Sequence, residues 1–187
     1  MTLLEMKKKV LALIEETSQT ESELTDDPDI KEKINDVINQ VQFELARIKK
    51  IPARDKKQIA KDSLVIDLNT VENFYQLDHI KFENEEGEDS VFEIFGDIAE
   101  FTEPGTATIY YYKYPKAITA DTEDDYIFEL SKDVLEIMPY GVAADILKSD
   151  VSNGYGQIYN QRYEQMLQRL DPRYSTGFIY IDQGVMI

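Results

Sequence analysis

The sequence has 187 residues, of which 42% are hydrophobic, and this is enough to bury the core of one domain or of one domain with a small insertion. It contains no cysteine, which excludes disulfides, thiolate zinc sites and thiol nucleophiles. Residues 1–62 hold 12 Lys and Arg against 13 Asp and Glu, so residues 63–187 carry -16 of the net charge of -17, a surface that disfavours binding to a phosphate backbone.

Residues 1–16 read MTLLEMKKKVLALIEE, with the lysines inside a helical pattern and without a long apolar run or a small-residue cleavage site. We therefore expect neither a signal peptide nor a membrane span here, and we place the protein in a cytosol or in a particle assembled there. Thr2 and Glu5 have the spacing of a capping box, which predicts an amphipathic helix over 3–16.

A second and longer helix is predicted from Pro28 onward. Asp27 can cap it, Pro28 fits the first helical position and Asp29 complements the positive end of the helix dipole. Apolar residues then recur at steps of three and four up to Ile48, and Pro52 disfavours helix in the residue before it. The segment ARDKKQIAKDS that follows is interpreted as a short helical or irregular connector.

From Leu64 the pattern changes to short stretches rich in β-branched and aromatic residues. Five strands are predicted, LVIDL, FYQLDHIKF, SVFEIFG, AEFTE and TATIYYYKY, and they are separated by turn-forming residues. In the last of them Tyr110, Tyr112 and Tyr114 alternate with Ile109 and Tyr111, so both faces of this strand are expected to be covered. Pro115 has no backbone N–H to give to a sheet, and it ends the strand.

The helical period returns at Leu130 and runs to Leu147, with Pro139 predicting a kink or a fresh helix start. A last helix is predicted over Gln157–Leu170. The fold class expected from this order is α+β: a mainly helical bundle made by 1–62 and 120–174, a small antiparallel β-sheet or barrel inserted as subdomain 63–119, and an extended tail over 175–187.

No catalytic, cofactor-binding or metal site is predicted. The acidic residues of loop 121–125 do not have the spacing of a calcium loop, and Asp124 and Asp125 are interpreted as preceding a helix. His79 is the only histidine, which excludes a His-based triad and a two-His metal site within one chain, and it is interpreted as a strand residue. Gly154-Tyr155-Gly156 lacks the lysine of a phosphate loop. We expect no enzyme activity.

The segment Phe128–Asp171 resembles the C-terminal helical pair of head–tail connector, or adaptor, proteins of tailed bacteriophages. The resemblance lies in Leu135, Pro139-Tyr140, Val142-Ala143-Ala144, Asp150, Tyr159, Arg162-Tyr163-Glu164 and Leu167. Upstream, Tyr112 and Tyr114-Pro115, followed by Ile118-Thr119 and Asp121-Thr122, resemble the strand exit of members with a β insertion. The resemblance covers about 60 residues well, and the long helix after Pro28 loosely.

This resemblance implies a structural virion protein at the neck, assembled in the host cytoplasm. It implies a homo-oligomeric ring of twelve copies that binds the portal protein and other connector or tail proteins, with DNA only as passing cargo and without a membrane partner. The apolar C-terminal tail has no following residues to pair with, and we predict that it docks on a partner by strand addition. The predicted interface residues are Phe178, Ile179, Tyr180, Ile181, Val185, Met186 and Ile187.

Three alternatives stay open at this point. The tail can instead pair with the sheet of its own chain, because edge strands need covering. The acidic surface also fits an inhibitor that mimics DNA and binds a basic host protein. A carbohydrate-binding or carbohydrate-hydrolysing β domain is supported only by tyrosines and carboxylates.

Overall fold

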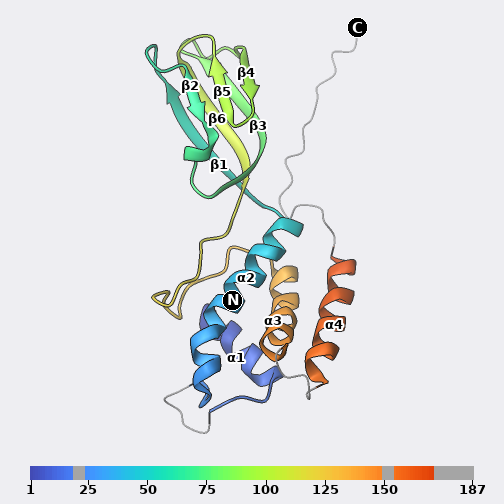
Figure 1. The fold of residues 1–187 in the computed structure, drawn as a ribbon. Coiled ribbons are helices and arrows are strands. Elements are labelled where there is room, and N and C mark those ends of the chain that lie inside the picture. Colours follow the sequence, from blue (N-terminus) through green and yellow to red (C-terminus); the bar gives the residue numbers. More distant parts are fainter. Residues whose placement is uncertain (19–23, 149–153, 171–187) are drawn as a thin grey trace.

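The computed structural model describes residues 1–18, 24–148 and 154–170, and within them the chain forms two lobes (Figure 1). The helical lobe contains α1 (Leu3–Leu13), α2 (Pro28–Ile48), α3 (Lys132–Leu147) and α4 (Tyr155–Arg169). The β lobe contains β1 (Ile51–Ile59), β2 (Val65–Asp67), the short 3-10 helix η1 (Leu68–Thr70), β3 (Phe74–Asn84), β4 (Phe92–Phe95), β5 (Ile98–Phe101) and β6 (Gly105–Lys113).

The predicted fold class, a mainly helical bundle with a small inserted sheet, is wrong. The fold is mixed: the described residues form four α-helices and two three-stranded antiparallel sheets, with 41% helix and 28% strand, and the sheets build a hydrophobic core. The helical or irregular connector predicted after Pro52 is strand β1, so the sheet begins before residue 63. The polar residues of this segment masked the strand pattern in the sequence: Arg54, Lys56 and Gln58 point outward from β1 into solvent.

The two sheets have the strand orders β1-β6-β3 and β2-β5-β4. They bury their inner faces in one shared cluster, to which both sheets contribute. That cluster contains Ile59, Ile66, Leu68, Val71, Ile80, Phe82, Ala99, Phe101, Ala107, Ile109 and Tyr111. Gly105 is the first residue of β6 and lies close to β3. A Cβ at this position would lie 2.2 Å from the Glu83 carbonyl oxygen, so only glycine fits. The β lobe is therefore a sandwich of two sheets.

Both predicted N-terminal helices are confirmed, together with their caps. Thr2 and Glu5 form the capping box at the start of α1, and the Asp27 carboxylate accepts hydrogen bonds from the backbone N–H groups of Asp29 and Ile30 at the start of α2. These caps satisfy donors that the first turn of a helix leaves free. Pro139 lies inside α3, which continues through it from Lys132 to Leu147.

Loop 114–131 crosses the helical lobe and ties down the start of α1. The N–H groups of Leu3 and Leu4 donate to the carbonyl oxygens of Tyr126 and Asp124, and the Lys7 ammonium lies 2.8 Å from the Asp124 carboxylate. Asp124 and Asp125 were predicted to precede a helix, but α3 begins only at Lys132. The acidic loop instead accepts hydrogen bonds from the N-terminus of α1, because the first N–H groups of a helix have no acceptor within the helix.

The two lobes meet at a junction of aromatic and cationic side chains from α2, β3 and the end of β6. The Tyr114 ring lies 5.5 Å from Phe43 and 4.7 Å from Tyr75, between ring centroids. The Lys50 ammonium lies 4.9 Å from the centre of the Tyr112 ring, which is a cation–π contact. Near its end β6 is covered on both faces, as predicted: Tyr111 lies in the β core and Tyr112 is buried at the junction, whereas Tyr110 is half-buried.

We expect Gly141→Ala to destabilise the fold by about 1–3 kcal/mol, because a Cβ at residue 141 of α3 would lie 2.8 Å from the ring of Tyr163 on α4. Urea unfolding measures this. The matched control is Gly154→Ala, where the backbone φ is -62° and no atom lies within 4 Å of the new Cβ. Equal stability of the two variants would contradict this packing of α3 against α4.

Alkaline pH should destabilise the protein partly through Tyr126. Burial, and then the Glu129 carboxylate, raise the pKa of Tyr126 from 10.0 to about 12. The folded state holds this proton more tightly than the unfolded state, so the stability it gives is full below pH 10 and is lost as the pH rises towards 12. Urea midpoints across this range should fall less for Tyr126→Phe than for the wild type. The exposed Tyr155→Phe is the control, and equal falls for all three proteins would contradict the assignment.

Candidate interaction surfaces

The outer face of the β2-β5-β4 sheet is acidic and apolar. Strand pairing puts Val65, Glu100 and Glu93 in one row across the sheet, and the next outward row contains Asp67, Ile98 and Phe95. The residues between these rows, Ile66 and Ala99, point inward and are buried. Alternation along three short strands thus gathers carboxylates and large apolar side chains on one exposed surface.

Phe95 is the most exposed large apolar side chain among the described residues, at 86%. It lies at the end of β4, where Gly96 with φ +61° begins the two-residue turn into β5. Glycine at the first turn position permits this tight hairpin, which leaves Phe95 at its tip. Val65 on the same face is 49% exposed. Exposed aromatic side chains of this kind are typical anchors of protein interfaces.

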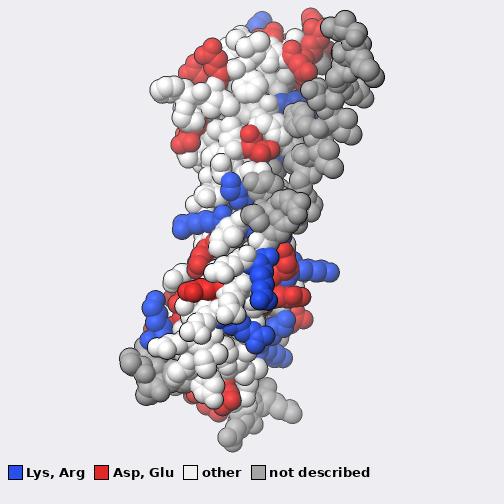
Figure 2. All heavy atoms as spheres, turned by 90° about the vertical axis from the view of Figure 1, so that its right-hand side faces the viewer, with Lys and Arg blue, Asp and Glu red and all other residues white. Residues whose placement is uncertain are grey.

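The charge of this region has one sign. Residues 83–103 contain nine Asp and Glu and neither Lys nor Arg. Glu93 and Glu100 are direct cross-strand partners, an arrangement that is unfavourable by a few tenths of a kcal/mol up to about 1 kcal/mol in an isolated sheet. On the face drawn in Figure 2, acidic side chains outnumber basic ones over the upper, β end of the molecule, and acidic and basic side chains are mixed over its middle and helical half. A cationic partner surface would relieve this repulsion.

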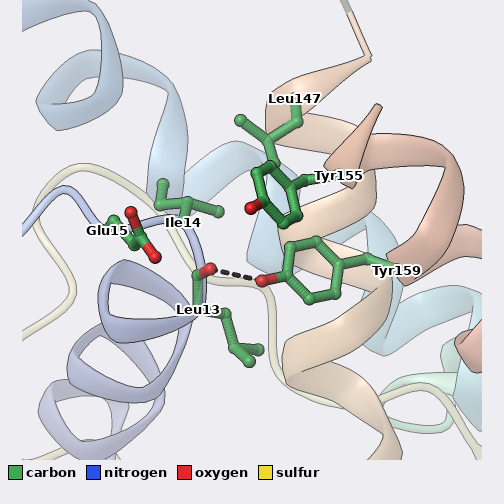
Figure 3. A pocket seen from close by; sticks show the side chains of 6 residues that line it. All are labelled: Leu13, Ile14, Glu15, Leu147, Tyr155 and Tyr159. Carbon is green, nitrogen blue, oxygen red and sulfur yellow. Dashed lines mark hydrogen bonds between the residues drawn. The ribbon is translucent and has the colours of Figure 1, made fainter. Parts of the chain in front are cut away.

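A small pocket of about 70 Å³ lies where the end of α1 meets the end of α3 and the start of α4 (Figure 3). The Tyr159 hydroxyl donates a hydrogen bond across it to the Leu13 carbonyl oxygen. Burial, and then the nearby Glu15 carboxylate, raise the pKa of Tyr159. The pocket is too small for a substrate beyond a few waters. Its tyrosine fixes α4 to the C-terminus of α1.

Glu15 at the rim of this pocket has a left-handed backbone, with φ 61°. The N–H of Glu16 donates to the carbonyl oxygen of Leu11, the six-to-one bond of a Schellman motif, in which glycine usually takes the left-handed position. A glutamate in that position carries conformational strain.

The sequence-predicted sites fare as follows. Among the described residues, His, Asp and Glu form no group of three or more that could hold a metal ion. His79 is a strand residue in β3, as interpreted, with its Nδ1 2.8 Å from the Asp78 carboxylate and its ring stacked on Tyr110. Tyr155 and Gly156 form the first turn of α4. The tail residues Phe178–Ile181 and Val185–Ile187 lie outside the described residues.

Sequence reasoning missed the acidic sheet face. The local pattern FEIFGDIAE carried its signal, since every second residue on each side of the Gly-Asp turn is acidic or large and apolar, but the full face forms only when β2 pairs with β5. Over the described parts of the chain, no helix combines the length and the apolar character needed to cross a bilayer. In comparisons with known proteins, the chain matches no family model and no curated sequence.

Replacing the strained residue at the pocket rim should stabilise the protein. We expect Glu15→Gly to raise the free energy of unfolding by up to about 1 kcal/mol, because glycine adopts the left-handed backbone without a Cβ clash. Glu16→Gly, one residue further on, is the matched control and should be neutral or destabilising. A stability gain for the control alone would contradict this account of the α1 end.

Proposed function

We propose that this chain is a head–tail connector protein of a tailed bacteriophage, a non-enzymatic virion component at the neck that joins the portal protein to tail proteins. The resemblance of Phe128–Asp171 is the starting point of this proposal. In the proposed role the chain forms a homo-oligomeric ring, of twelve copies as the resemblance implies, and DNA passes as cargo. The protein would be assembled in the host cytoplasm and would need no cofactor.

The structural observation that best supports this proposal is the acidic, apolar face of the β2-β5-β4 sheet. Phe95 and Val65 offer contact area for another protein, while Glu93 and Glu100 repel a phosphate backbone. A surface that binds protein and repels DNA suits a protein–protein contact in a DNA conduit better than a DNA clamp.

The described part of the segment that carries the resemblance, Phe128–Asp171, lies in the helical lobe. It spans α3 and α4, and α3 is the most buried helix of the lobe, with Val134, Met138, Val142 and Ala143 fully covered by its neighbours. Tyr163 of α4 packs on Gly141 of α3. These residues act as a scaffold, so contacts with partners would come from the β lobe and from the predicted tail.

A second candidate function is inhibition of a host DNA-binding protein by mimicry of DNA. The nine acidic residues between 83 and 103, with neither Lys nor Arg among them, favour it. A mimic needs carboxylates spaced like phosphates, and it binds a basic protein in a strongly salt-dependent way. The exposed Phe95 favours the connector, because an apolar side chain on the acidic face has no counterpart in a phosphate backbone.

Negative-stain electron microscopy tests the proposed function. The purified protein is imaged at high concentration, alone and mixed with virion or lysate fractions, beside a version that ends at Ser175. We expect rings or portal-bound particles with the full chain, and their loss with the truncated chain, because the predicted tail supplies partner contacts.

A monodisperse monomer that binds only basic proteins would contradict the connector proposal and favour the DNA mimic. Rings that persist without residues 176–187 would retain the connector but remove the role of the tail. Circular dichroism of the truncated chain provides the control, since the described lobes should keep their secondary structure.

A further inference from the structure

The β lobe has a second outer face, and its chemistry is the opposite of the first. Strand pairing in the β1-β6-β3 sheet aligns three outward rows of side chains. These rows are Arg54, Tyr110 and His79; Lys56, Thr108 and Lys81; and Gln58, Thr106 and Glu83. The alternating residues Ala107 and Ile109 of β6 point inward and are fully buried. Of these outward side chains Arg54, Lys56, Gln58 and Lys81 are exposed, whereas Tyr110 and His79 are half-buried.

This second face is basic. It carries Arg54, Lys56 and Lys81, which are all exposed. It also carries two carboxylates, each next to a basic side chain: Glu83 lies 2.6 Å from the Lys81 ammonium, which lowers the pKa of Glu83, and Asp78 lies 2.8 Å from Nδ1 of His79. Arg54 and Lys56 therefore supply the excess positive charge of this face. The centre of the face is flat and polar, with Thr108 on β6 beside the Tyr110 ring stacked on His79.

The acidic and basic faces point away from each other. The inner sides of both sheets share one core, in which Ile80 and Ile109 of the first sheet pack with Ile66 and Ala99 of the second. Each copy of the chain therefore presents Arg54, Lys56 and Lys81 on one side of the sandwich and Asp67, Glu93 and Glu100 on the other. The basic face thus has three cations against the carboxylates of Glu83 and Asp78, and the acidic face has three carboxylates in its two outward rows, which contain neither Lys nor Arg.

We propose that β lobes of successive copies stack front to back, so that the acidic, apolar face of one copy covers the basic face of the next. This inference deepens the proposed function, on which it rests for the ring, by naming the interface between subunits. Such a contact is heterologous, and it closes into a ring when the rotation between neighbours divides a full turn. Phe95 would be the apolar anchor, and the cations of the neighbour would relieve the opposed Glu93 and Glu100.

Other pairings of these faces are unfavourable. A two-fold contact between two acidic faces would bring Glu93 and Glu100 of both copies together, and a contact between two basic faces would do the same for Arg54 and Lys56. A foreign basic protein would satisfy the acidic face but would offer no carboxylates to Arg54 and Lys56 on the basic face. A second copy of the chain satisfies both faces with one contact.

Charge reversal tests this proposal. One variant carries Arg54→Glu and Lys56→Glu, and another carries Glu93→Lys and Glu100→Lys. Assembly is measured by sedimentation velocity over a concentration series at about 0.1 M salt, and at about 1 M salt, where the Debye length shortens from about 10 to about 3 Å. The wild type should assemble at the lower salt, and each variant alone should need at least about tenfold higher concentration.

The two variants mixed in equal amounts should assemble again, because one now has two acidic faces and the other two basic ones. A chain with all four substitutions should also assemble. The matched control is Lys8→Glu with Lys9→Glu, which makes the same charge change on exposed residues of α1 and should assemble like the wild type. Circular dichroism checks that every variant is folded.

Three results would overturn the proposal: a wild type that stays monomeric at its highest soluble concentration, single-face variants that assemble as the wild type does, or a mixture that does not recover. Rings that form regardless of these charges would remove this interface and leave the connector function in place. A wild type that neither assembles nor binds portal-containing particles would remove the connector function itself.

Discussion

Strand β6 holds the two lobes together, and most of the structure depends on its position. It is the central strand of the β1-β6-β3 sheet, so it joins the strand that follows α2 to the strand that follows η1. Ile109 and Tyr111 on its inner side fill the β core. The chain then leaves the sheet at Tyr114, whose ring packs against Phe43 of α2 and Tyr75 of β3. The run of tyrosines is thus needed to cover one strand from both sides and to dock it on a helix.

The junction also explains the entry into the β lobe. Helix α2 ends at Ile48 and β1 begins at Ile51, so only two residues separate a long helix from the edge of the sheet. Lys49 of this short link is buried and forms an ion pair with Asp133 at the start of α3. Lys50 turns the other way and contacts Tyr112 and Gln76. Adjacent lysines thus tie one link to both lobes, which restricts the orientation of one lobe against the other.

The sequence predicts elements with strong local signals. The capping box of Thr2 and Glu5, the Asp27-Pro28 start of α2 and the Pro115 limit of β6 are all local, and the structure confirms them. Strand β1 was missed because Arg54, Lys56 and Gln58 make its exposed side polar, and its partner β6 lies about 50 residues later. The size of the β lobe depends on this long-range pairing, which the sequence does not reveal, and for this reason the predicted fold class was wrong.

The two charged faces could not be predicted for the same reason. Net charge along the chain shows that residues 63–187 are acidic, but it does not show that Arg54 and Lys56 share a surface with Lys81. That surface exists only when β1 and β3 flank β6 in this register. This arrangement changes the interpretation of the net negative charge. Carboxylates gathered on the side opposite a basic face suit head-to-tail assembly of copies better than a general repulsion of nucleic acid.

Disulfide cross-linking between the two outer faces tests the front-to-back stacking of β lobes most directly. The chain has no cysteine, so Thr108→Cys at the centre of the basic face and Ile98→Cys on the acidic face introduce the only thiols. We expect a covalent dimer when the two single variants are mixed and oxidised, and a ladder of higher species when one chain carries both. Thiols that remain unlinked in samples shown to be oligomeric would contradict the front-to-back stacking of β lobes.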